Sequence, residues 1–185
     1  MKATGIVRRI DDLGRVVIPK EIRRTMRIRE GDPLEIYTDR EGEVIFKKYS
    51  PIGELSSFAS QYADTLHRTC NMLVLISDRD AVIAVAGVSR KEYGERPLSD
   101  EMEKIMEGRG IYVWRDGSEK IYPTRDAGSY FVSCAMPIIS EGDVVGSVIS
   151  LSDQNGEKNR ETSTAELESK LVQTAAGFLG RQMDS

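Results

Sequence analysis

The chain has 185 residues, which suits one large domain or two small ones. Its 26 Lys and Arg against 30 Asp and Glu give a net charge of −4, and this average argues against a nucleic-acid-binding protein. No apolar run approaches the roughly 18 residues of a membrane span, and no signal peptide is evident, so we expect a cytoplasmic protein. A single histidine, His67, argues against His-based metal sites and catalytic triads, and no cofactor is predicted.

The charge is divided unevenly along the chain. Residues 1–29 hold nine basic and three acidic side chains, a net charge of +6, so the remaining 156 residues carry −10. Asymmetry of this kind between segments predicts two functions on one chain.

The first fifty residues have the pattern of short strands around one short helix. A turn over residues 11–14 contains Gly14, and Pro19 stops the second strand and begins a helix predicted over residues 20–27. The sequence of residues 39–42 predicts a hairpin turn between two strands. The strands themselves are predicted over residues 6–10, 15–18, 34–38 and 43–48. A unit this small buries little surface alone, so we expect it to fold as a dimer.

Ser50 and Pro51 mark a domain boundary, because they suit the N-cap and the first position of a helix predicted over residues 51–67. Further helices are predicted over residues 99–107 and 164–183, the last with an apolar stripe from Leu167 through Leu171, Ala175 and Phe178 to Leu179. Strands are predicted over residues 71–77, 81–86, 111–114, 130–139 and 144–151. The pattern indicates an α+β fold, with helices on one face of an antiparallel sheet.

The N-terminal segment carries a specific motif. It reads Thr-Gly-Ile-Val-Arg from Thr4, Asp-Leu-Gly-Arg-Val-Val-Ile-Pro from Asp12 and Ile-Arg-Arg from Ile22. This motif resembles the AbrB-type swapped-hairpin DNA-binding domain of bacterial transition-state regulators. The whole chain is similar to a family of sporulation regulators that joins this domain to a C-terminal GAF domain. The resemblance implies a swapped-hairpin β-barrel dimer domain over residues 1–50, then a GAF-like α/β sandwich with flanking helices over residues 51–185.

The resemblance also implies a binding partner and the residues that contact it. The partner is double-stranded DNA, and the expected function is regulation of sporulation genes, as activator and as repressor. The family's DNA-contacting arginines correspond to Arg8, Arg15, Arg23 and Arg24, with Lys2, Arg9 and Arg27 as additional candidates. Guanidinium groups grip phosphates bidentately and read guanine in the major groove, which suits this role. The alternative is a solvated basic face without a partner.

The C-terminal domain is expected to assemble the protein, and it is a candidate sensor of an unknown small molecule. GAF domains generally cup a ligand between the sheet and its loops, so the candidate pocket residues are Trp114, Tyr122, Arg125 and Tyr130. Their alternative role is that of ordinary core and rim residues. The two terminal helices of the domain are expected to pair between subunits as a four-helix bundle, which together with the N-terminal dimer predicts a tetramer.

Two other functions share parts of this pattern. Antitoxins of the MazE type use the same swapped hairpin but append a disordered tail, whereas residues 51–185 are predicted to fold. Some GAF proteins reduce methionine sulfoxide with a catalytic cysteine, so Cys70 and Cys134 would be the residues to test. Nothing in the sequence indicates an acidic thiol, and we expect no enzymatic activity.

Overall fold

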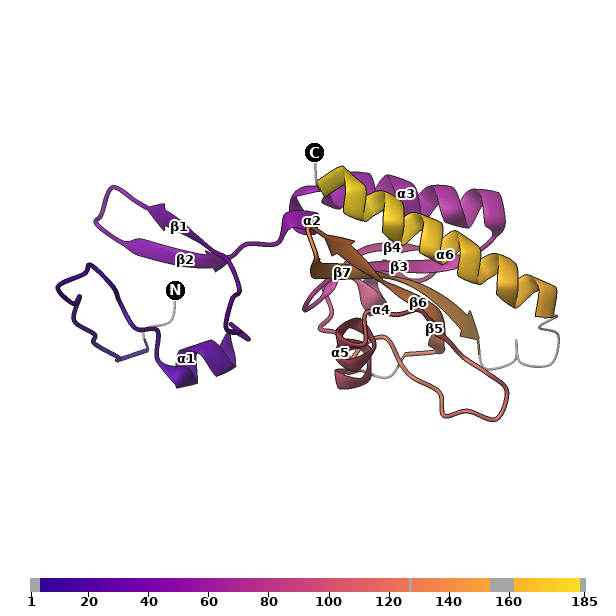
Figure 1. The fold of residues 1–185 in the computed structure, drawn as a ribbon, viewed down its shortest axis with the longest axis horizontal. Coiled ribbons are helices and arrows are strands. Elements are labelled where there is room, and N and C mark those ends of the chain that lie inside the picture. The colour runs from indigo at the N-terminus through magenta and orange to yellow at the C-terminus, as the bar shows by residue number, and fades with distance from the viewer. Residues whose placement is uncertain (1–3, 127, 154–161, 184–185) are drawn as a thin grey trace. The chain divides into compact units, whose positions relative to one another are not determined.

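A computed structural model describes residues 4–126, 128–153 and 162–183. The chain divides into two compact units, Met1–Tyr49 and Ser50–Ser185, both drawn in Figure 1. In the part of the chain that the structure describes, no helix has the length and apolar character needed to cross a membrane.

The N-terminal unit contains one helix, α1 (Lys20–Thr25), and one antiparallel hairpin of β1 (Leu34–Thr38) and β2 (Val44–Lys48). The Asp39 carboxylate closes the hairpin turn, because its Oδ1 accepts hydrogen bonds from the backbone N–H groups of Glu41 and Glu43, both at 2.9 Å. The hairpin predicted at residues 39–42 is therefore confirmed.

Two predicted strands of this unit are not formed in the single chain. Residues 6–10 and 15–18 are not β-strands, although the turn between them closes through a hydrogen bond from the Gly14 N–H to the Asp11 carbonyl, at 3.0 Å. A β-strand forms when its backbone N–H and C=O groups pair with those of a neighbouring strand. The described part of a single chain provides no such neighbour for these residues. The predicted helix over 20–27 also ends early, at Thr25, because Arg27 has a φ of 52°.

The C-terminal unit is built on a five-stranded antiparallel sheet in the order β4-β3-β7-β6-β5. A two-residue turn, Glu141-Gly142, joins the two long central strands, and both of its residues have the positive φ that such hairpin turns require. The strands are β3 (Leu73–Asp78), β4 (Val82–Ala86), β5 (Tyr112–Val113), β6 (Tyr130–Ser140) and β7 (Asp143–Asp153).

Helices cover both faces of this sheet, not one face as predicted. Alternate residues of β3 show the division: Val74 and Ile76 pack in one buried cluster and Leu75 packs in the other. On the first face α3 (Ser56–Cys70) and α6 (Thr162–Met183) lie side by side (Figure 1). The second face is covered by α5 (Asp100–Glu107) and by α4 (Arg90–Tyr93), a helix that the sequence did not predict.

The first helix of the unit is broken rather than continuous. A short helix, α2 (Pro51–Glu54), precedes α3, and the break falls at Leu55. Ser50 caps α2 as predicted, since its Oγ accepts a hydrogen bond from the Gly53 N–H at 3.2 Å. Ile52 of α2 is fully buried in the core beneath α3 and α6.

The buried face of α6 differs from the predicted stripe. The residues packed against the sheet are Val172, Ala175, Ala176 and Leu179. Two members of the predicted stripe, Leu167 and Phe178, are instead 59% and 42% exposed. The four buried residues follow the i, i+3, i+4, i+7 spacing of one helix face, and positions 167 and 178 fall outside that face.

Candidate nucleic-acid interface

The basic N-terminal unit presents its arginines on three separate segments. Arg8 and Arg9 are exposed in the segment before the first turn, Arg15 follows that turn, and Arg23 and Arg24 are exposed on α1. Among the described residues no ion pair engages Arg8, Arg9, Arg23 or Arg24. Lys2 lies outside the described residues. Four guanidinium groups are thus available to an anionic partner.

Arg15 is held by a carboxylate. Asp11 Oδ2 pairs with the Arg15 Nε at 2.7 Å, and Asp11 Oδ1 accepts hydrogen bonds from the backbone N–H groups of Leu13 at 3.0 Å and Arg15 at 2.8 Å. These bonds from the Arg15 backbone and side chain lower the pKa of Asp11 from its usual 3.8. Asp11 therefore closes the turn and orients Arg15, a positioning role that the sequence analysis missed. The turn-forming Asp-Asp-Leu-Gly pattern was the signal available.

Arg27 is involved in the internal structure of the unit. It is half-buried in the left-handed region, and its carbonyl accepts a hydrogen bond from Lys48 Nζ at 2.9 Å. Lys48 Nζ also lies 3.6 Å from Asp32 Oδ2, which accepts the Arg29 N–H at 2.8 Å. The Asp32 side chain is only 3% exposed, so this ion pair links the end of α1 to the hairpin. Sequence reasoning missed this link because its members are far apart in the chain.

The N-terminal unit lacks a buried core of its own. None of its described residues is buried in the single chain, and it holds twelve of the fourteen large apolar side chains that the structure exposes. Val7 at 88% and Val17 at 71% are the extreme cases. Burial of apolar surface is the main favourable contribution to folding, and a unit without it is not stable alone.

Two of the predicted pocket residues, Trp114 and Tyr122, pack in the core or at its edge. Trp114 is 7% exposed, and its ring packs edge-on against Phe131 with centroids 5.0 Å apart. Its Nε1 donates a hydrogen bond to the Ser118 carbonyl at 3.2 Å. Tyr122 is half-buried, and its carbonyl accepts the Ser99 hydroxyl at 2.7 Å.

The other two have different neighbours. Arg125 is exposed, and it forms an ion pair with Asp100 at 2.8 Å. Tyr130 begins β6, and its ring lies 6.5 Å from that of Tyr93 between centroids. No hydrogen bond, ion pair or ring contact joins any two of the four candidates, which all lie in the described part of the chain, so their shared role in a pocket stays a prediction.

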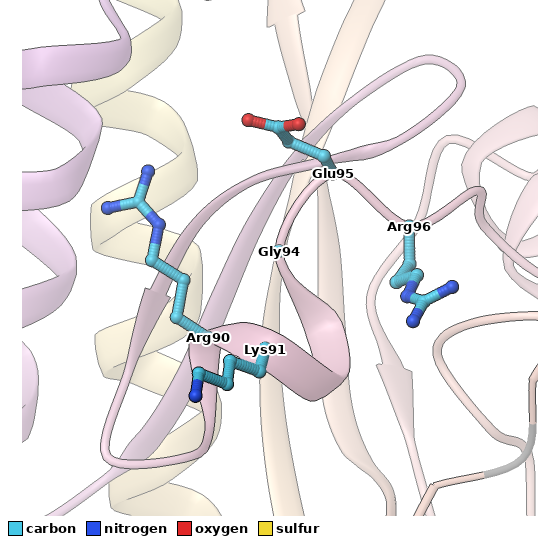
Figure 2. A pocket seen from close by; sticks show the side chains of 5 residues that line it. All are labelled: Arg90, Lys91, Gly94, Glu95 and Arg96. Carbon is cyan, nitrogen blue, oxygen red and sulfur yellow. The ribbon is translucent and has the colours of Figure 1, made fainter.

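A surface hollow of about 430 Å³ lies beside α4 and is lined by Arg90, Lys91, Gly94, Glu95 and Arg96. Figure 2 shows that the side chains of Arg90, Lys91 and Arg96 point in different directions. Arg96 also lies 3.4 Å from the Asp126 carboxylate. The three cations do not converge on one point, and none of the predicted pocket residues lines this hollow.

The two cysteines occupy different environments. Cys70 ends α3 and is exposed, whereas Cys134 is fully buried in β6, with its Sγ 4.0 Å from the Ser169 hydroxyl. Within the described ranges, no group of three or more His, Cys, Asp or Glu side chains is placed to hold a metal ion.

Two family profiles match this chain. Residues 54–184 match the profile described as "Stage V sporulation protein T C-terminal, transcription factor". Residues 7–53 match the profile described as "Antidote-toxin recognition MazE, bacterial antitoxin".

Individual proteins resemble the chain over all or part of its length. Stage V sporulation protein T of Bacillus subtilis is 52% identical over 187 residues, covering 100% of this chain and 99% of that protein. The transition state regulatory protein AbrB of Bacillus subtilis is 37% identical over 107 residues, covering 58% of this chain and 95% of that protein. A GAF domain of A. aeolicus superposes with a TM-score of 0.52 at 10% identity, covering 68% of this chain and 82% of that one.

The solved GAF domain supports the fold alone, and it agrees with the predicted GAF-like architecture. The first family profile covers more than half of the chain, and the relative named first spans all of it. The resemblance predicted from the sequence is thereby confirmed, and this chain belongs to the stage V sporulation protein T family of transcription factors.

Proposed function

We propose that this chain regulates sporulation genes, as activator or repressor according to the promoter, by binding double-stranded DNA with an arginine-rich surface. The observation that carries this proposal is the net charge of +6 in residues 1–29 of an otherwise acidic chain. The proposed contacts are made by Arg8, Arg15, Arg23 and Arg24, supplemented by Lys2, Arg9 and Arg27. The acidic remainder of the chain is repelled by phosphate, which leaves the N-terminal unit as the DNA-binding part.

A gel-shift series with promoter DNA tests this assignment. We expect Arg15→Ala and Arg23→Ala each to weaken binding, because each removes a cation that neutralises phosphate. Arg40→Ala is the matched control: Arg40 is exposed in the β1–β2 turn of the same unit and is not among the proposed contacts. Promoter binding left intact by both Arg15→Ala and Arg23→Ala would refute the assignment.

The DNA-binding unit is proposed to be a dimer of residues 1–50 from two chains. The exposed apolar side chains of this unit support pairing, since a second copy provides the surface that would bury them. Residues 6–10 and 15–18 would then find strand partners in the other copy. Analytical ultracentrifugation of residues 1–50 should show a dimer, and a stable folded monomer would contradict the proposal.

The C-terminal unit, proposed as residues 51–185, would join two such dimers into a tetramer. Aromatic side chains gather where α3 and α6 lie side by side: Phe178 is stacked on Tyr62 with centroids 5.5 Å apart and lies 5.9 Å from Phe58. Phe178 and Leu167 leave apolar surface exposed on this side of the unit. Light scattering at micromolar concentration should give the mass of a tetramer, and the mass of a dimer would contradict this assembly.

The same unit is the proposed sensor of a small molecule, with Trp114, Tyr122, Arg125 and Tyr130 as candidate contacts. Ligand binding would change the relative placement of the DNA-binding units. Thermal-shift screening of the full chain against metabolites tests this role. A screen without any hit would leave assembly as the function of the unit.

An antitoxin function is less well supported, although residues 7–53 match an antitoxin profile. The second unit has a five-stranded sheet with buried clusters on both faces, which differs from the disordered tail expected of such antitoxins. We also propose that the chain is cytoplasmic and is not an enzyme. Full burial withholds the Cys134 thiol from a substrate, and turnover lost in Cys70→Ser or Cys134→Ser would contradict the absence of catalysis.

A further inference from the structure

The helix α1, which carries two of the proposed DNA contacts, is too short to hold its own orientation. It has six residues, none of which is buried, and no side chain among the described residues caps its first turn. Isolated helices shorter than about 12 residues are marginal in water, because few hydrogen bonds offset the entropy lost in nucleation. The orientation of Arg23 and Arg24 therefore depends on the contacts that fix α1 within its unit.

The last turn of α1 is closed through the backbone carbonyls of these same two arginines. The Ile28 N–H donates to the Arg23 carbonyl at 2.8 Å. The Arg27 N–H donates to the Arg24 carbonyl at 3.3 Å. Together these bonds form a Schellman motif, which places the residue after the helix cap in the left-handed region. Arg27 occupies that position with a φ of 52°, where glycine is the usual residue, so neighbouring contacts must stabilise it.

Lys48 of β2 provides such a contact. Its Nζ donates a hydrogen bond to the Arg27 carbonyl at 2.9 Å and lies 3.6 Å from the Asp32 carboxylate. The Asp32 and Lys48 side chains are only 3% and 23% exposed. A cation is favoured at this point because the carbonyl groups at the C-terminal end of a helix carry partial negative charge. Burial strengthens the attraction, since less water lies between the charges.

The two adjacent lysines of β2 have different surroundings. Lys47 is exposed, and its Nζ lies over the Tyr37 ring, 4.5 Å from the centroid. Lys48 is instead held to the segment after α1, because the Asp32 carboxylate that pairs with it also accepts the Arg29 N–H at 2.8 Å. Loss of the Lys48 amine thus loosens the end of α1, whereas loss of the Lys47 amine removes the same charge and leaves that end intact.

We propose that Lys48 is a positioning residue for DNA binding, which fixes the end of α1 so that Arg23 and Arg24 meet DNA in one orientation. The proposal rests on the DNA-binding role proposed above and adds to it a residue that acts without touching DNA. Groups that are already ordered lose less conformational freedom on binding, so a fixed helix gives higher affinity. Replacing Lys48 should therefore weaken binding through the two arginines.

A double-mutant cycle on the full chain, measured by fluorescence anisotropy with promoter DNA, tests this route. Lys48→Met should weaken binding about tenfold, the effect of one hydrogen bond from a charged group. In an Arg23→Ala chain the same substitution should weaken it only about threefold, because Arg24 alone remains to be positioned. Lys47→Met is the matched control and should have the same effect in both chains. Equal effects of Lys48→Met in the two chains would overturn the proposal, because independent contacts add.

Asp32→Asn is a second variant, which serves also if Lys48→Met does not fold. It keeps an oxygen for the Arg29 N–H but removes the negative charge that pairs with Lys48. A gain of positive charge by itself strengthens binding to the phosphate backbone. Positioning predicts the opposite sign, a loss of promoter affinity, and stronger binding would overturn the proposal.

Hydrogen exchange separates local loosening from general unfolding and needs no DNA. In Lys48→Met the Ile28 amide should exchange about tenfold faster. The Asp39 amide, which donates to the Glu43 carbonyl at 3.2 Å in the hairpin turn, should exchange at its original rate. Unchanged exchange at Ile28, or equal acceleration at both amides, would overturn the proposal. Faster exchange at Ile28 combined with promoter binding left intact by Arg23→Ala would overturn it at its premise, by refuting the DNA contact proposed for Arg23.

Discussion

Replacing Arg23 by Gln is expected to weaken DNA binding by removing phosphate neutralisation. Arg23 is exposed on α1, and no ion pair among the described residues competes for its charge. In a dimer the substitution removes two charges from the eight contacts that Arg8, Arg15, Arg23 and Arg24 of the two chains would make. Each neutralised phosphate contributes about −0.9 to the slope of log affinity against log salt concentration, so the slope should change from about −7 to about −5.

Fluorescence anisotropy with a labelled promoter duplex measures this slope. Between about 50 and 200 mM salt, the original chain should lose affinity by about 10⁴ and the variant by about 10³. Arg40→Gln in the hairpin turn makes the same change of charge in the same unit, so it controls for net charge. The reasoning would be refuted if Arg23→Gln left the slope unchanged. It would also be refuted if Arg40→Gln reduced the magnitude of the slope as much as Arg23→Gln does, because the effect would then not depend on the proposed contact.

Three further predictions follow from single contacts. Asp11→Ala removes the carboxylate that orients Arg15, so DNA affinity should fall in the same anisotropy assay; a rise would indicate that only net charge matters. Burial raises the pKa of Tyr93 to about 12, above its ordinary value of 10, so its contribution to stability is present below about pH 10 and is lost as the pH rises toward 12. Urea unfolding at about pH 9 and pH 11 should show this loss, and Tyr93→Phe should reduce it. Phe178→Glu places a charge on the aromatic surface of α3 and α6, and light scattering should then report a dimer; an unchanged tetramer would exclude this surface from the interface.

Local structure was predictable where a few neighbouring residues determine it. The cap of α2 is an example, since Ser50 accepts the Gly53 N–H at 3.2 Å. The Asp39 hairpin is another. These motifs involve residues two to four positions apart, so the sequence contains nearly all of the interaction.

The sequence predicted the types of residue in the candidate site, but it did not predict the contacts that hold those residues in place. The motif and the charge indicated Arg15, yet they did not reveal that Asp11 orients it. The link from Lys48 to Asp32 joins segments that are distant in the sequence. The helix α4 was missed because its four residues are too few to give a periodic signal.

The sequence alone determined three properties of this protein. These are the charge of +6 in residues 1–29 against −10 in the remainder, the arginine motif and the order of most elements. The tertiary structure was needed to show that helices cover both faces of the sheet and that α6 buries Val172 and Ala176 while exposing Leu167 and Phe178. It also revealed that the N-terminal unit buries none of its described residues in a single chain. The physical reason is that charge and local hydrogen bonds belong to the sequence, whereas burial depends on which distant surfaces meet.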